Sequence, residues 1–263
     1  MPFTVSHIAA VMPGYRPLTR AHVFSAAVIG SMVPDFGLLL PRYPARVETH
    51  SLLALITFCL PVGLATYWLT QLLIKPAVIE VLPDGAYARL KAAHPAAALS
   101  SIHTWFTVTA ALLFGALTHL IWDAFTHENA RGVRTFPMLG SFDLEFEGHP
   151  LVLYLWLQFI SSVVGLLVVV AALIVWLRNA QTPATPSVRL ICARERAVWI
   201  FVFLLPPVMF VSRVVRTLWT WRLLGLHIWT AWAAGSVAIA SIRGAAVSLL
   251  LVSALLRIRL AII

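Results

Sequence analysis

The chain has few charged residues and very few acids. Only 11% of its 263 residues are charged, and 10 Asp and Glu stand against 19 Lys and Arg, for a formal net charge of +9. Charged residues make up about 25% of a typical soluble domain, so this composition excludes an ordinary soluble protein. The hydrophobic content of 60% and the mean hydropathy of +0.90 instead indicate a membrane protein.

Cysteine is also scarce, with only Cys59 and Cys192 in the chain. Two cysteines so far apart form neither a metal-binding spacing nor a disulfide framework. The arginines are scattered through the polar segments without a basic stripe, so we expect no nucleic-acid partner. Contact with anionic lipid head groups explains these arginines better.

Several apolar runs reach the roughly 20 residues that a helix needs to cross a bilayer. We expect five spans, at residues 52–74, 105–122, 151–177, 197–215 and 229–256, and four to six are possible. The fold class is therefore an all-α, polytopic membrane bundle, and residues 1–263 are expected to form a single integral membrane domain. Polar motifs are confined to residues 1–150, whereas residues 151–263 are mainly membrane helices with Glu195 as the only acid.

The most informative segment is THLIWDAFTH at residues 118–127. His119, Asp123 and His127 recur every four residues, so on an α-helix they form one ridge with steps of about 6 Å. Imidazoles and carboxylates bind metal ions well, and ionisable groups inside a membrane are costly and usually functional. We therefore expect a continuous helix through His127 whose ridge faces the protein interior and binds metal. A hydrogen-bonded polar network is the alternative.

Four further residues are candidate metal ligands. His7 is near the start of the chain, Asp35 follows a proline that ends an apolar segment, and His50 immediately precedes the first expected span. His149 follows an acidic stretch. With five spans, residues 1–51 and 123–150 lie on the same side of the membrane, so these candidates share one face with the ridge.

The ridge spacing favours more than one ion. On a straight helix His119 and His127 are about 12 Å apart, too far to share an ion at bond lengths near 2 Å. Asp123 lies between them and has two oxygens with which to bridge two ions. Such a pair of ions stabilises the attacking and leaving oxygens in phosphoester hydrolysis. We expect one or two divalent ions, with Zn²⁺ first.

Segments along most of the chain resemble the uncharacterised bacterial membrane family DUF4184. They are MPFTVSH at residues 1–7, GSMVPD at 30–35, THS at 49–51, residues 119–127 and residues 154–165. The resemblance implies a multi-pass protein of the bacterial inner membrane. The basic linker at residues 178–196 and the basic C-terminus favour a cytoplasmic position for their side, so the site would face outward.

That family resembles, more distantly, membrane-bound metal-dependent hydrolases and zinc-dependent phospholipases C. The phospholipase pattern is followed in order by His7, Asp35, His50, His119, Asp123 and His127. The chain departs from this pattern in two ways. It lacks the N-terminal Trp of the phospholipases. The pattern also has a Glu four residues after its last histidine, whereas Leu153 stands four residues after His149. The resemblance therefore implies one or two ions rather than three.

The leading hypothesis is a membrane-embedded metal-dependent hydrolase of a lipid or lipid-linked phosphoester. One ion would be held by Asp35, His50, His119 and Asp123, and a second by His7 and His127. The expected catalytic residues are Asp123 and two candidate bases, Glu145 and Glu48. The phosphate would be bound by Arg42, Arg46 or Arg131. The alternative is a non-catalytic membrane protein whose metal is structural, sensed or transported.

Overall fold

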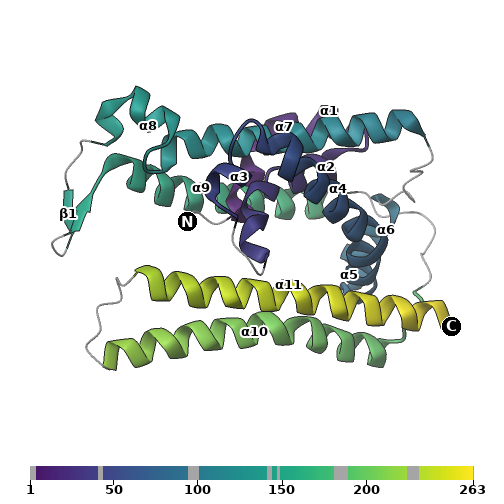
Figure 1. The fold of residues 1–263 in the computed structure, drawn as a ribbon. Helices are drawn as coiled ribbons and strands as arrows, with labels where there is room; N and C mark the ends of the chain where they lie inside the picture. Colours follow the sequence, from purple (N-terminus) through teal and green to yellow (C-terminus); the bar gives the residue numbers. More distant parts are fainter. Residues whose placement is uncertain are drawn as a thin grey trace. The chain divides into compact units, whose positions relative to one another are not determined.

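The computed structural model describes residues 4–40, 44–93, 101–140, 144–146, 149–180, 189–223 and 231–262. These residues are almost entirely helical (Figure 1). They form two compact units. The first comprises Met1–Gly37, Pro44–Tyr67 and Ala98–Asn179, and the second Leu38–Tyr43, Trp68–Ala97 and Ala180–Ile263. The expectation of a single domain stays a prediction.

Four helices among the described residues are long and apolar enough to cross a membrane: Leu55–Val81, Ile102–Thr126, Leu153–Asn179 and Ile242–Ala261. They match the first, second, third and fifth expected spans. The fourth expected span lies within a continuous helix, Ala193–Leu223, which is not among the four. The all-α membrane bundle is therefore confirmed, with a span count inside the expected range.

The first unit carries the polar motifs. Its N-terminal half consists of η1 (Thr4–Gly14), α1 (Tyr15–Arg20), α2 (Phe24–Gly30), η2 (Val33–Leu39), α3 (Arg46–Thr49), η3 (Leu55–Cys59) and α4 (Leu60–Leu69). The other half consists of α7 (Ile102–Thr126), α8 (Arg131–Thr135), η5 (Pro137–Leu139), a hairpin of β1 (Leu144–Phe146) and β2 (His149–Leu151), and α9 (Leu153–Asn179). The outer side of α9 exposes large apolar side chains such as Phe159, Val163 and Leu167, as a lipid-facing surface requires.

The second unit is built around the antiparallel pair α10 (Ala193–Leu223) and α11 (Ala231–Ile262), which lie side by side (Figure 1). Its other elements are η4 (Thr70–Ile74), α5 (Lys75–Val81) and α6 (Asp84–Ala93). Buried Glu80 pairs with Lys91 at 2.9 Å. Arg189 donates hydrogen bonds to the carbonyl oxygens of Glu80 and Leu82. This unit therefore satisfies its one described buried acid internally.

Close packing of α2 against α7 forms the core of the first unit. A Cβ atom on Gly30 would lie 2.1 Å from the carbonyl oxygen of Leu112, and one on Gly115 would lie 2.1 Å from that of Ala27. Only glycine allows this approach, which is the usual device of membrane helices that bring their backbones together. The polar end of α7 is thereby held against the segment that follows α2.

The N-terminal segment η1 packs on α9 in the same way. A Cβ atom on Gly165 would lie 2.8 Å from the carbonyl oxygen of Ser6. Ser6 and His7 are fully buried as a result. The position of His7 therefore depends on a small residue in the third expected span.

The glycine contact at α2 and α7 predicts a stability effect. Gly115→Ala should lower the free energy of unfolding by about 1–3 kcal/mol, because the added methyl group forces the helices apart. Gly244→Ala on α11 is the matched control, since nothing lies within 4 Å of its added Cβ. Thermal unfolding in detergent measures both, and equal melting temperatures would contradict the packing argument.

Candidate metal centre

The buried end of α7 supplies two side chains of the centre. His119 and Asp123 are 0% and 3% exposed and lie one turn apart on the inner face of the helix. The helix ends at Thr126, so the expected continuous helix through His127 is wrong by one residue. His127 has an extended backbone, with φ −128°, and a turn with Asn129 at φ 58° then redirects the chain.

Because the helix ends before His127, the distance of about 12 Å expected between His119 and His127 on a straight helix does not apply. The ring of His127 turns back, and its Nδ1 lies 3.3 Å from Oδ1 of Asp123. The Gln158 amide nitrogen lies 3.2 Å from its Nε2, and an amide N–H can only donate. In this tautomer the proton of His127 lies on Nδ1, which is also 3.2 Å from the Thr126 hydroxyl. The metal-binding role of His127 stays a prediction.

Two segments distant in sequence bring Asp35 and His50 to α7. Asp35 lies in the first turn of η2, where Thr4 donates a 2.7 Å hydrogen bond to its Oδ2. His50 follows α3, and its Nδ1 lies 2.6 Å from the Thr49 hydroxyl. Because these contacts occupy the outer atoms, Oδ1 of Asp35 and Nε2 of His50 face the centre, 3.4 Å apart.

His119 and Asp123 complete a set of four donor atoms. His119 Nε2 lies 3.7 Å from Asp35 Oδ1 and 3.5 Å from Asp123 Oδ2. His50 Nε2 lies 3.5 Å from the same Asp123 oxygen. Four ligand atoms around a tetrahedral Zn²⁺, with bonds of about 2.0–2.2 Å, are about 3.3–3.6 Å from one another. Four of the six spacings in this set of donors, which we call the tetrahedral set, are therefore close to those around one such ion.

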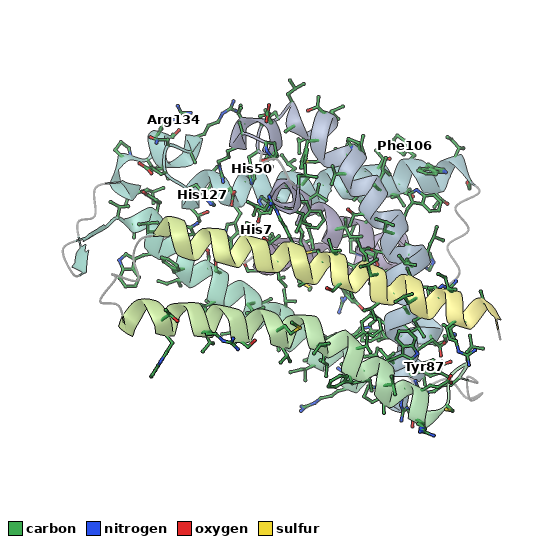
Figure 2. All side chains as sticks on the ribbon, turned by 60° about the horizontal axis from the view of Figure 1, so that its bottom comes forward. His7, His50, Tyr87, Phe106, His127 and Arg134 are labelled. Carbon is green, nitrogen blue, oxygen red and sulfur yellow. The ribbon has the colours of Figure 1, made fainter. Side chains whose placement is uncertain are left out.

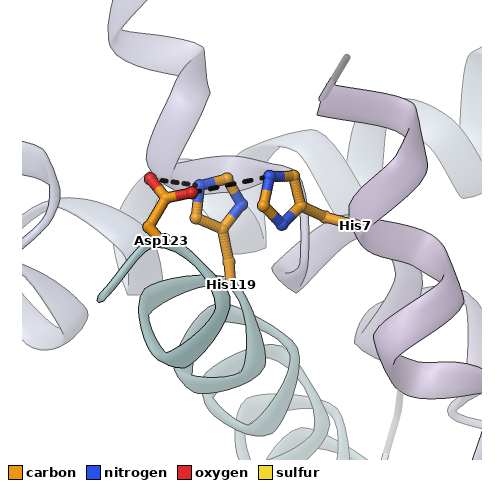
Figure 3. Close-up of side chains that lie close together, drawn as sticks. All are labelled: His7, His119 and Asp123. Carbon is orange, nitrogen blue, oxygen red and sulfur yellow. Dashed lines mark ion pairs between the residues drawn. The ribbon is translucent and has the colours of Figure 1, made fainter. Parts of the chain in front are cut away.

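His7 adds a third imidazole from η1 (Figure 3). Its ring stacks on that of His119 with centroids 3.8 Å apart, and its Nε2 lies 3.7 Å from Oδ1 of Asp123. His7, His119 and Asp123 form one group with donor atoms within 4.8 Å, and Asp35, His50 and His119 form another. We call these five residues the His–Asp cluster. His7, His50 and nearby His127 come together from three segments in Figure 2.

The protonation of His119 is fixed by its neighbour. Its Nδ1 lies 2.7 Å from the carbonyl oxygen of Ser31, which can only accept a hydrogen bond. The proton therefore sits on Nδ1, and in the neutral ring Nε2 directs a lone pair at two carboxylates. Lone pairs that face one another in a buried site need a proton or a metal ion between them. Metal-bound histidines usually make such a hydrogen bond with their other nitrogen.

Unpartnered polar atoms gather in the cluster. Among the described residues, six buried side-chain N or O atoms lack a hydrogen-bond partner. Five of the six belong to the cluster: both nitrogens of His7, Nε2 of His50, Nε2 of His119 and Oδ1 of Asp123. Each unsatisfied buried group costs about 1–3 kcal/mol. A bound cation would remove that cost, so these buried groups could hold a metal ion.

The charge states of His7 and Asp35, which lie outside the candidate spans, favour the binding of a cation. Burial lowers the pKa of the His7 imidazole to about 4, so the ring is neutral at pH 7, as a ligand must be. Burial acts to raise the pKa of the Asp35 carboxyl, but hydrogen bonds from His50 and Thr4 and the nearby His119 outweigh it. The pKa of Asp35 therefore lies below its usual value, and the carboxylate is ionised.

A match to a known family covers nearly the whole chain. Residues 1–254 match the model of a family described as a domain of unknown function, DUF4184. The chain belongs to the DUF4184 family. Among curated proteins and among solved structures, none matches it.

The remaining expected site residues of this DUF4184 protein are outside the His–Asp cluster or outside the described residues. Glu48 is exposed, and its carboxylate accepts a 2.7 Å hydrogen bond from the Ala45 backbone N–H, so it caps α3. The side chains of Glu145 and His149, and all of Arg42, lie outside the described residues. Arg131 is exposed at the start of α8. The catalytic roles of Glu48 and Glu145 and the metal-binding role of His149 stay predictions.

Sequence reasoning missed the residues that orient the ligands. Thr4, Ser31 and Thr49 each hold one ligand by a short hydrogen bond. Gln158 on α9 contacts His127 in addition. Thr4, Ser31 and Thr49 are each within four residues of a ligand in sequence, which is the one signal that could have pointed to them.

The geometry of the DUF4184 cluster predicts the effect of removing its central charge. Asp123→Asn should reduce bound Zn²⁺ to below about a tenth of the wild-type amount, because a neutral amide is a poor ligand. Metal content of the purified protein, measured by elemental analysis, tests this. Glu80→Gln is the control, because Glu80 is an equally buried carboxylate outside the cluster. Equal metal in Asp123→Asn and wild type would show that this carboxylate is not a ligand.

Proposed function

We propose that this DUF4184 protein is a membrane-embedded, metal-dependent hydrolase that acts on a lipid or lipid-linked phosphoester. One observation carries the proposal. The buried, unpartnered donor atoms of the His–Asp cluster converge in the last two turns of a candidate span. A site at the end of a span is close to the level of the lipid head groups, where a phosphoester of a membrane lipid would be found.

The donor set supports a site for a catalytic ion with a possible second position. Asp35, His50, His119 and the Oδ2 atom of Asp123 form the tetrahedral set described above. The other oxygen of Asp123 faces His7 at 3.7 Å, so the carboxylate has donors left for a second ion. A divalent ion would polarise the phosphoryl group and lower the pKa of a water molecule.

The protein residues around the ion would do the remaining work. The apolar packing of α2 against α7 excludes bulk water from the inner side of the cluster, and low polarity strengthens the electrostatic contacts there. Thr4, Ser31 and Thr49 would hold Asp35, His119 and His50 in position. Glu145 or Glu48 would accept a proton, and a base of this kind contributes about 10²–10⁴-fold to the rate.

The resemblance of the family to metal-dependent hydrolases and phospholipases C supports the same reaction. His7, Asp35, His50, His119 and Asp123 follow the order of the phospholipase pattern. We place this DUF4184 protein in the bacterial inner membrane with the site facing outward, which the basic linker at residues 178–196 favours.

A structural metal is the second candidate function, and a specific observation favours it. Four protein donors spaced for one tetrahedral ion can fill its coordination sphere, and closed sites of this kind are structural. A hydrolytic site must instead keep or open one position. Release of one Asp123 oxygen would open that position.

The test of hydrolysis uses the full chain in detergent, loaded with Zn²⁺ and offered water-soluble phosphodiesters and phospholipids in mixed micelles. Turnover should disappear with a chelator and return with the ion. His50→Gln should reduce turnover below detection, because it removes a ligand, while His103→Gln on the exposed start of α7 should not. Stoichiometric metal without turnover of any substrate would favour the structural ion.

The candidate bases give a separate prediction. Glu145→Gln and Glu48→Gln should both keep the full metal content, because neither carboxylate belongs to the tetrahedral set. The variant that removes the base should lower kcat by about 10²–10⁴-fold, and the other should leave kcat unchanged. Elemental analysis and steady-state kinetics on the same preparations measure both effects. Loss of metal in either variant would assign that glutamate as a ligand instead.

A further inference from the structure

Arg46 is an exposed charged residue that contacts the His–Asp cluster. Its side chain is 48% exposed, whereas the side chain of its partner Asp123 is 5% exposed. The side chains of the neighbouring ligands His50 and Asp35 are also largely buried. A ligand that approaches Asp123 from the side of Arg46 therefore meets the exposed guanidinium first.

The guanidinium of Arg46 contacts the atom that an ion would use. Its terminal nitrogen donates a 2.6 Å hydrogen bond to Oδ2 of Asp123. The same oxygen lies 3.5 Å from the Nε2 atoms of His50 and His119, within the tetrahedral set. A guanidinium and a divalent ion are both positive, so they repel each other and compete for this oxygen.

The pair of Arg46 with Asp123 is suited to exchange. Solvent screens the half-exposed guanidinium, so this pair is weaker than a fully buried one. A guanidinium has five N–H donors in a planar fork that matches two oxygens of a phosphate. The structure describes one hydrogen bond from Arg46 to an acceptor. The remaining donors can bind an anion without rearrangement of the buried ligands.

We propose that Arg46 exchanges partners, so that a divalent ion takes its place on Asp123 and Arg46 then binds a phosphoryl group of the substrate beside the ion. Ion and phosphate therefore bind cooperatively, and each raises the affinity of the other by the same factor. The inference rests on the proposed metal centre and names its ligand class as a phosphate or phosphoester. It does not depend on hydrolysis.

A purely structural role for Arg46 makes the opposite prediction. Removal of a residue that orients a metal ligand lowers the affinity for the metal by about 10–100-fold. Exchange predicts that Arg46→Ala binds the ion several-fold more tightly than wild type in the absence of phosphate, because a competing cation has gone. The sign of this change separates the two roles.

The experiment titrates Co²⁺, which has a visible spectrum, into the full chain in detergent, with and without inorganic phosphate. Wild type should bind Co²⁺ at least about fivefold more tightly with phosphate, a typical coupling. Arg46→Ala should lose most of this gain. Arg46→Lys should keep the wild-type affinity for Co²⁺ alone but show a reduced gain, because an ammonium lacks the fork. Arg134→Ala, an exposed arginine on α8 (Figure 2), is the matched control and should behave as wild type.

A second arm replaces inorganic phosphate with phosphatidic acid in mixed micelles, which separates a lipid source from a free phosphate. Coupling in either arm that depends on Arg46 supports the exchange, and coupling only with micelles assigns a lipid head group. Arg46→Ala with weaker or unchanged Co²⁺ affinity, or with the full phosphate gain, would overturn it. Coupling without turnover of any phosphoester would leave the exchange standing and reject the hydrolase.

Discussion

The buried carboxylate of Asp123 is the constraint on which the first unit depends. A charge near the end of an apolar helix is costly unless other groups compensate it. Five side chains from η1, α3, α7 and the residues at their ends approach its two oxygens: His7, Arg46, His50, His119 and His127. The positions of the segments that carry these side chains allow the side chains to compensate the charge of Asp123.

Small residues make this convergence possible. Gly30 and Gly115 let α2 and α7 approach until the Ser31 carbonyl reaches His119, and Gly165 lets η1 lie close enough to α9 to bury His7. Larger side chains at these positions would separate the ligand-bearing segments by more than a metal site tolerates. The geometry of the cluster therefore depends on the close packing of the apolar helices.

The cluster has a closed side and an open side. On the closed side, the outward atoms of Asp35, His50 and His119 are hydrogen-bonded. The Nε2 atoms of His50 and His119, which face the centre, lack hydrogen-bond partners. Outside, Arg46 connects the central carboxylate to an accessible surface. A purely structural ion would have little use for a half-exposed arginine on one of its ligands. An arginine at this position supports the proposed hydrolase, because it would bind an anionic substrate beside the ion.

The sequence alone determined the fold class, the approximate spans and the residue types of the centre. The periodicity of His119 and Asp123 placed them on one buried helical face, since a helix repeats every 3.6 residues whatever its surroundings. It could not locate the end of α7, because the turn after Thr126 depends on α8, and so it misjudged the place of His127. The division of donors between the two Asp123 oxygens, and the pairing with Arg46, were decided by tertiary structure. These contacts join residues as far apart as 46 and 123, and their distances follow from packing that no local pattern encodes.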